Sequence, residues 1–171
     1  LPGSAVTHHA AITTAYLDWY KRVASPESYW PNVQCPTLFL EAANDYNAPF
    51  DFVVKGMSLQ PTNVPQRLAV APHFNHRFET LSYAARVLWQ KSHLTGTFSF
   101  PQKAVAQLNL TQPDGIPVFS VWPDTSTANT IAGVDIYYGY DRDPLNRFWR
   151  DAQAVQTNGH WEGKCPVYDL N

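Results

Sequence analysis

A repeated strand, loop and helix pattern across residues 37–92 most constrains the fold of this chain. The run TLFL at residues 37–40 is apolar on both faces, as a central strand of a parallel sheet is. A second short strand is expected at residues 67–71, in the sequence RLAVA. Each strand precedes a loop and a helical pattern, so the segment predicts a right-handed parallel crossover covered by helices.

The helical patterns rest on apolar residues that recur on one face. Residues 8–23 are expected to form a helix with a buried stripe of Ile12, Ala15, Tyr16, Trp19 and Val23. The helix after the first strand has the stripe Phe50, Val53, Val54 and Met57, with Pro49 at its start. The helix at residues 78–90 has the stripe Phe78, Leu81, Ala85, Leu88 and Trp89.

Beyond about residue 95 the helical periodicity gives way to short alternating runs. Residues 105–110 alternate with period two, and residues 117–122 and 134–138 are expected to be further strands. The sequence Pro113-Asp114-Gly115 is a strong turn signal between the first two. We therefore predict an α/β domain over residues 1–95, followed by a small antiparallel β-sandwich over residues 96–171.

Composition excludes several classes of partner. Twelve basic and fourteen acidic residues give a formal net charge of −2, and no basic stripe is present, which argues against a nucleic-acid or anionic-membrane surface. No apolar run approaches the length of a membrane span. Cys35 and Cys165 form no CxxC pair, so no metal or redox motif is indicated and two unpaired thiols are expected.

Two chemically active side chains follow the two predicted strands. Asp45 lies in the loop after the first strand and His76 in the loop after the second. Because the carboxyl ends of neighbouring parallel strands meet at one edge of the sheet, these side chains should lie close together. A carboxylate that binds one imidazole nitrogen orients the ring and leaves the other nitrogen free to act as a base. His73 is an alternative base from the same loop.

The sequences CPTLFLEAANDYNAPFD and RLAVAPHFNHRFE resemble the last two core strands of α/β-hydrolases, in the branch of acetyl xylan esterases, dienelactone hydrolases and prolyl-oligopeptidase-like enzymes. The resemblance implies that Asp45 is the acid and His76 the base of a catalytic triad, in a carboxylesterase that needs no cofactor. The tail IYYGYDRDPLNRFWRDA is similar to the all-β extension of some secreted bacterial relatives, which suggests a secreted or periplasmic location. Ala42-Ala43 departs from the pattern, since glycine is frequent there.

The nucleophile of such a triad is missing from this sequence. The serine of this fold sits in a G-x-S-x-G elbow that precedes the acid, and the chain contains no such motif. Gly56-Met57-Ser58 follows Asp45 and falls inside a predicted helix. We therefore expect the C-terminal part of a larger hydrolase, inactive alone, with residues 1–30 as a lid or connecting helix. Its bare sheet edge predicts self-association or pairing with the upstream remainder of the hydrolase.

Two other interpretations use the same residues. His73, His76 and Asp45 could supply metal ligands, although their spacing matches no known metal signature. The second region could instead be a non-catalytic binding module for a protein or a carbohydrate, with Trp122 and Trp149 as aromatic residues that face the ligand. In that case Asp45 and His76 are incidental.

Overall fold

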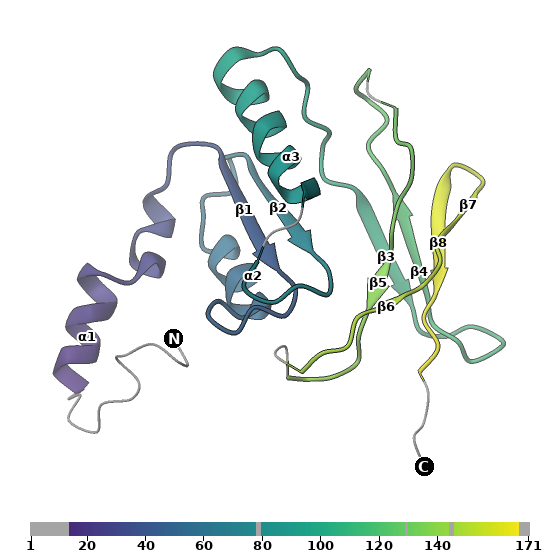
Figure 1. Cartoon of the computed structure of the whole chain (residues 1–171), viewed down its shortest axis with the longest axis horizontal. Coiled ribbons are helices and arrows are strands. Elements are labelled where there is room, and N and C mark those ends of the chain that lie inside the picture. Colours follow the sequence, from purple (N-terminus) through teal and green to yellow (C-terminus); the bar gives the residue numbers. More distant parts are fainter. Residues whose placement is uncertain (1–13, 78–79, 129, 144–145, 168–171) are drawn as a thin grey trace. The chain divides into compact units, whose positions relative to one another are not determined.

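The protein has mixed helices and strands, with parallel and antiparallel sheets (Figure 1). The computed structural model describes residues 14–77, 80–128, 130–143 and 146–167. The chain divides into two compact units. The first comprises Leu1–Val87 with Asp143–Asn146, and the second comprises Leu88–Arg142 with Arg147–Asn171.

The first unit is built around a parallel pair of strands. Strand β1 (Thr37–Ala42) pairs with β2 (Gln66–Ala71) in parallel register from Thr37 opposite Gln66 to Ala42 opposite Ala71. The helix α2 (Phe50–Ser58) connects them and packs against β1, and α3 (Thr80–Gln90) follows β2. The predicted order of strands and helices is therefore present, and both strands are longer than predicted.

The aromatic ring of Trp30 packs between β1 and α2 in the interior of this unit. The ring of Trp30 stacks on Phe39 of β1 at a centroid distance of 4.7 Å. A Cβ atom on Gly56 of α2 would lie 3.7 Å from the same Trp30 ring, which is ordinary van der Waals contact. The proline-rich connector forms two short 3₁₀ turns, η1 (Pro26–Ser28) and η2 (Trp30–Asn32), and Trp30 is the first residue of the second. Stacked aromatic contact and apolar burial thus fix β1 against the helix that follows it.

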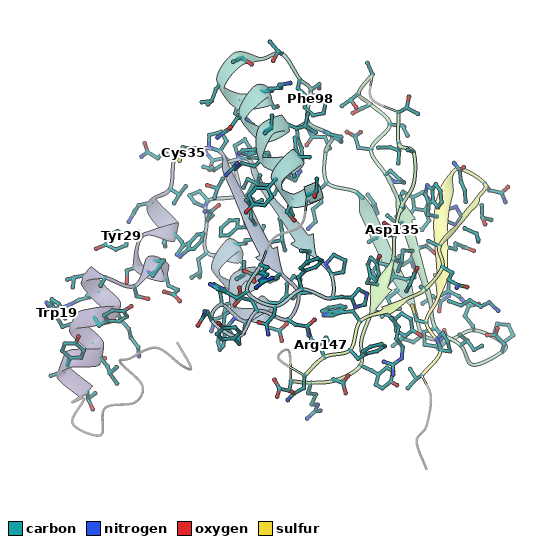
Figure 2. All side chains as sticks on the ribbon, viewed as in Figure 1. Trp19, Tyr29, Cys35, Phe98, Asp135 and Arg147 are labelled. Carbon is teal, nitrogen blue, oxygen red and sulfur yellow. The ribbon has the colours of Figure 1, made fainter. Side chains whose placement is uncertain are left out.

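The N-terminal helix corrects one prediction. Helix α1 (Thr14–Val23) begins at the first described residue, so positions 8–13, including Ile12, lie outside the described residues. The expected buried stripe is wrong, because Tyr16, Trp19 and Val23 are 44%, 49% and 45% exposed; Figure 2 labels Trp19 on this helix. Among the helices and strands of the described residues, only the short turn η1 makes more than slight contact with α1. The helical period was predicted correctly, but a period does not specify a neighbour to bury it.

The two remaining predicted stripes are partly correct. In α2, Phe50, Val53 and Met57 are half-buried, whereas Val54 is 43% exposed, so its assignment to the buried face is wrong. In α3, Trp89 is buried and Ala85 and Leu88 are half-buried; the side chain of Leu81 and all of Phe78 lie outside the described residues. A π-helical turn, Lys91–Thr95, continues α3 and ends at Gly96, whose φ of +65° suits glycine.

The second unit contains two antiparallel layers. One is a four-stranded sheet in the order β3 (Val105–Asn109), β4 (Val118–Trp122), β8 (His160–Lys164), β7 (Val155–Thr157). The other pairs β5 (Tyr137–Tyr138) with β6 (Arg150–Asp151). A Cβ on Gly163 of β8 would come within 2.7 Å of the Cβ of Ala152 and 3.3 Å of Ile136 Cδ1. The absence of a side chain at Gly163 therefore lets the layers meet closely.

Candidate acid–base site

The loops after β1 and β2 are joined by backbone hydrogen bonds at the carboxyl ends of both strands. The N–H of Ala43 donates to the carbonyl of Ala71 at 3.0 Å, which extends the ladder by one step. The N–H of Asn44 then donates to the carbonyl of Phe74 at 3.0 Å. These bonds fix the two loops to each other, so the side chains that they carry are held at one end of the parallel pair.

The structure brings Asp45 and His76 into direct contact. The Nδ1 atom of His76 lies 2.8 Å from Oδ2 of Asp45, which is a hydrogen bond between groups 31 positions apart in sequence. The Asp45 side chain is 8% exposed, whereas the His76 side chain is 56% exposed. The carboxylate is therefore an internal anchor for a ring that remains open to solvent.

The second oxygen of Asp45 is held by the backbone that leads into α2. Its Oδ1 accepts hydrogen bonds from the N–H groups of Asn47 at 2.7 Å and Ala48 at 3.1 Å. Burial alone would raise the pKa of Asp45, but the bonds from His76 and from these two amides reverse that effect and lower the pKa below its ordinary value. Asp45 is therefore a carboxylate at neutral pH, and it can stabilise an imidazolium.

The His76 ring has further contacts from its own loop and the neighbouring one. Its backbone N–H donates to the side-chain oxygen of Asn75 at 2.9 Å, and the ring of Tyr46 lies 5.6 Å from the imidazole at an angle of 52°. Since Nδ1 faces Asp45, the Nε2 atom is the nitrogen available to a reacting group. Tyr46 and Asn75 were missed by sequence reasoning, because a loop sequence does not show which side chains will surround a given ring.

Among the described residues, the structure does not bring His73 into the hydrogen bond with Asp45, and it does not form the alternative metal site. His73 is exposed and has a φ of +62°, a backbone conformation rare for residues other than glycine, whereas the ring bonded to Asp45 is that of His76. No cluster of three or more metal-ligating side chains occurs in the described part of the chain, so Asp45, His73 and His76 do not form a three-ligand set.

Ser58 and the two cysteines, all among the described residues, lie away from the contact between Asp45 and His76 in sequence and form no hydrogen bond with it. Ser58 ends α2 and donates its hydroxyl to the carbonyl of Lys55 at 2.6 Å, as expected of a residue that is not a nucleophile in an elbow. Cys35 is exposed and Cys165 is buried, and both are free thiols. No helix in the described segments is both long and apolar enough to cross a membrane.

The two tryptophans proposed to face a ligand differ in their surroundings. Trp122 is 37% exposed on β4, and its ring stacks on His160 of β8 at 4.9 Å and 19°. The guanidinium of Arg147 lies over the ring of Trp149, 5.3 Å from its centre. Each ring therefore has one covered face, and Trp122 is the better candidate for stacking because it is the more exposed of the two, whereas Trp149 is half-buried.

We expect the Asp45 carboxylate to stabilise the fold measurably. Asp45→Ala removes the acceptor of two backbone amides and should lower the free energy of unfolding by about 2 kcal/mol at pH 7, measured by urea denaturation. Asp45→Asn keeps one acceptor oxygen and should cost less. Because its folded pKa is depressed, the stability from Asp45 is present above its ordinary value of 3.8 and is lost as the pH falls through the folded pKa.

The control for this prediction is Asp18→Ala, at an exposed position of α1. It should leave the free energy of unfolding nearly unchanged. Equal losses from Asp45→Ala and Asp18→Ala would contradict the anchoring role of the Asp45 carboxylate.

Comparison with known proteins identifies no relative of this chain. No protein-family model, no curated protein and no solved structure matches it.

Proposed function

We propose that this chain carries the acid and the base of a serine hydrolase of the α/β-hydrolase type, with carboxylesterase activity on an acyl ester. The nucleophilic serine of this enzyme lies outside these 171 residues. The observation that carries the proposal is the 2.8 Å contact between His76 Nδ1 and Asp45 Oδ2 at the carboxyl ends of two parallel strands. The resemblance of the two strand and loop sequences to such hydrolases supports the same roles.

The proposed reaction uses each group in turn. The Nε2 atom of His76 takes the proton of the serine hydroxyl as the serine oxygen attacks the ester carbonyl carbon. The imidazolium that forms is stabilised by the Asp45 carboxylate, which remains unprotonated. His76 then gives this proton to the departing alcohol as the acyl–oxygen bond breaks. In the second half, the same nitrogen takes a proton from water as the water oxygen bonds to the acyl carbon, and it returns this proton to the serine oxygen as the acyl–serine bond breaks and the acid leaves.

The location of the nucleophile provides a direct test. A fluorophosphonate probe, which forms a covalent bond with an activated serine, should not label this chain alone. It should label the complete hydrolase at a serine outside this segment. Labelling of a serine within residues 1–171 would contradict the proposal, because it would place the nucleophile in this chain.

A second candidate function is saccharide binding by the second unit. The observation that favours it is the group formed by Trp122, His160 and Glu162, where His160 Nε2 lies 2.8 Å from Glu162 Oε1. Trp122 and Glu162 are partly exposed, and an aromatic ring beside a carboxylate is a suitable surface for stacking on a sugar and binding its hydroxyl groups.

Calorimetric titration with xylo-oligosaccharides tests this second candidate. Binding should occur and should weaken at least about tenfold in Trp122→Ala, a loss typical of one stacking aromatic residue. Phe148→Ala, at a 62% exposed aromatic residue of the same unit, is the control and should bind like the wild type. Absence of binding in the wild type, or equal losses in both variants, would rule out this saccharide surface.

A further inference from the structure

Glu41 is a buried carboxyl group that the proposed mechanism does not use. It lies on β1, where it is 4% exposed, opposite Val70 of β2. Its Oε1 atom accepts a hydrogen bond from the N–H of Ala42 at 3.1 Å. A buried glutamate on a strand of otherwise apolar residues is costly in its charged form, so its presence requires a specific explanation.

A turn at the end of β1 connects the strand that carries Glu41 to the acid–base pair. The N–H of Asp45 donates to the carbonyl of Ala42 at 3.1 Å, which closes a four-residue turn at the end of β1. The turn folds Asp45 back towards the strand end that holds Glu41. Since His76 is bonded to Asp45, the three ionisable groups gather at the carboxyl end of the parallel pair.

The charges of the pair act on Glu41 in opposite directions. The pKa of Glu41 is raised to about 7 by the sum of these effects, of which burial is the largest, and the backbone bond from Ala42 opposes the rise. The Asp45 carboxylate raises the pKa of Glu41 further, and the His76 imidazolium lowers it. The elements beside β1 carry other charged residues, Arg67 on β2 and Asp51 and Lys55 on α2.

We propose that Glu41 is the third ionisable group of the acid–base site, a positioning residue whose charge is coupled to the charges of Asp45 and His76. The coupling is reciprocal: if the charge of one group changes the free energy of ionisation of Glu41, then the charge of Glu41 changes the free energy of ionisation of that group by the same amount. Ionised Glu41 therefore favours the imidazolium form of His76. This consequence for catalysis rests on the proposed function, since the imidazolium is the form that arises when His76 accepts the serine proton.

The test is a carbon-13 NMR titration of the Glu41 side-chain carboxyl in three proteins. The wild type should titrate with a midpoint of about 7. Asp45→Asn removes the like charge and should lower the midpoint by about half a pH unit, and His76→Gln removes the opposite charge and should raise it by about as much. Both substitutions are close in size to the original side chains, and Glu41→Gln identifies the signal by its loss.

Opposite shifts distinguish coupling from a change of structure. Lys21→Gln, on the exposed helix α1, is the control and should leave the midpoint of Glu41 unchanged. Equal midpoints in the wild type, Asp45→Asn and His76→Gln would overturn the proposal, as would shifts in the same direction. The titration needs neither a nucleophile nor a substrate, so its result is independent of whether the serine hydrolase proposal holds.

Discussion

Replacement of His76 by alanine should lower kcat about 10⁶-fold in the proposed hydrolase, with little change in KM. The loss is this large because the base and the nucleophile of a triad act as a unit, so removal of the base leaves only binding and oxyanion stabilisation. Asp45→Asn should reduce kcat by less, about 10⁴-fold, because it removes the charge that stabilises the imidazolium but leaves the base in place. Steady-state kinetics with a short-chain nitrophenyl ester measures both effects.

His73→Ala is the matched control, since it removes an imidazole from the same loop. It should reduce kcat less than about tenfold, because the ring that contacts Asp45 is that of His76. A larger loss from His73→Ala than from His76→Ala would exchange the roles of the two histidines. Equal small losses would exclude both from proton transfer.

The second large effect concerns stability and follows from the burial of Glu41. Its carboxyl ionises near its ordinary value of 4.5 in the unfolded chain but at about 7 in the folded protein. Between these values the folded state binds the extra proton, so the free energy of unfolding falls as the pH rises. The total decrease is about 3 kcal/mol and is complete just above pH 7.

Glu41→Gln should remove this decrease, because glutamine is neutral at every pH and still offers an oxygen to the N–H of Ala42. The variant should match the wild type below pH 4.5 and exceed its free energy of unfolding by about 3 kcal/mol at pH 8. Urea denaturation at a series of pH values measures the difference. Glu27→Gln, at an exposed glutamate whose pKa is lowered, should show no such gain. A constant difference across the pH range would contradict the burial of an ionisable Glu41.

The contact between Asp45 and His76 was predictable because it depends on a few strong sequence signals. Two apolar strands separated by one helix predict a parallel pair, and parallel strands bring their following loops to one edge. The structure has this register, and the two side chains meet in a hydrogen bond. The choice of His76 over His73 depended on the family resemblance, since His73 lies nearer the end of the strand and either ring could have reached Asp45.

Glu41, Tyr46 and the three last strands were missed for different physical reasons. Glu41 was visible as an acid within an apolar strand, but its burial depends on neighbours that are distant in sequence. Tyr46 approaches His76 through loop geometry that no periodicity encodes. The strands β6 and β7 have two and three residues, which is too short for alternation to be recognised. Strand β8 is as long as β3 and β4, but its sequence HWEGK contains only one large apolar residue.

Turnover of a nitrophenyl acetate ester tests the central claim most directly. The measurement compares this chain alone with the protein that joins it to the segment bearing the nucleophile. The proposal predicts no turnover by the chain alone, and turnover by the joined protein that His76→Ala abolishes and His73→Ala preserves. Turnover by this chain alone that survives His76→Ala would contradict the assignment of Asp45 and His76 as the acid and base of a triad whose serine lies outside this chain.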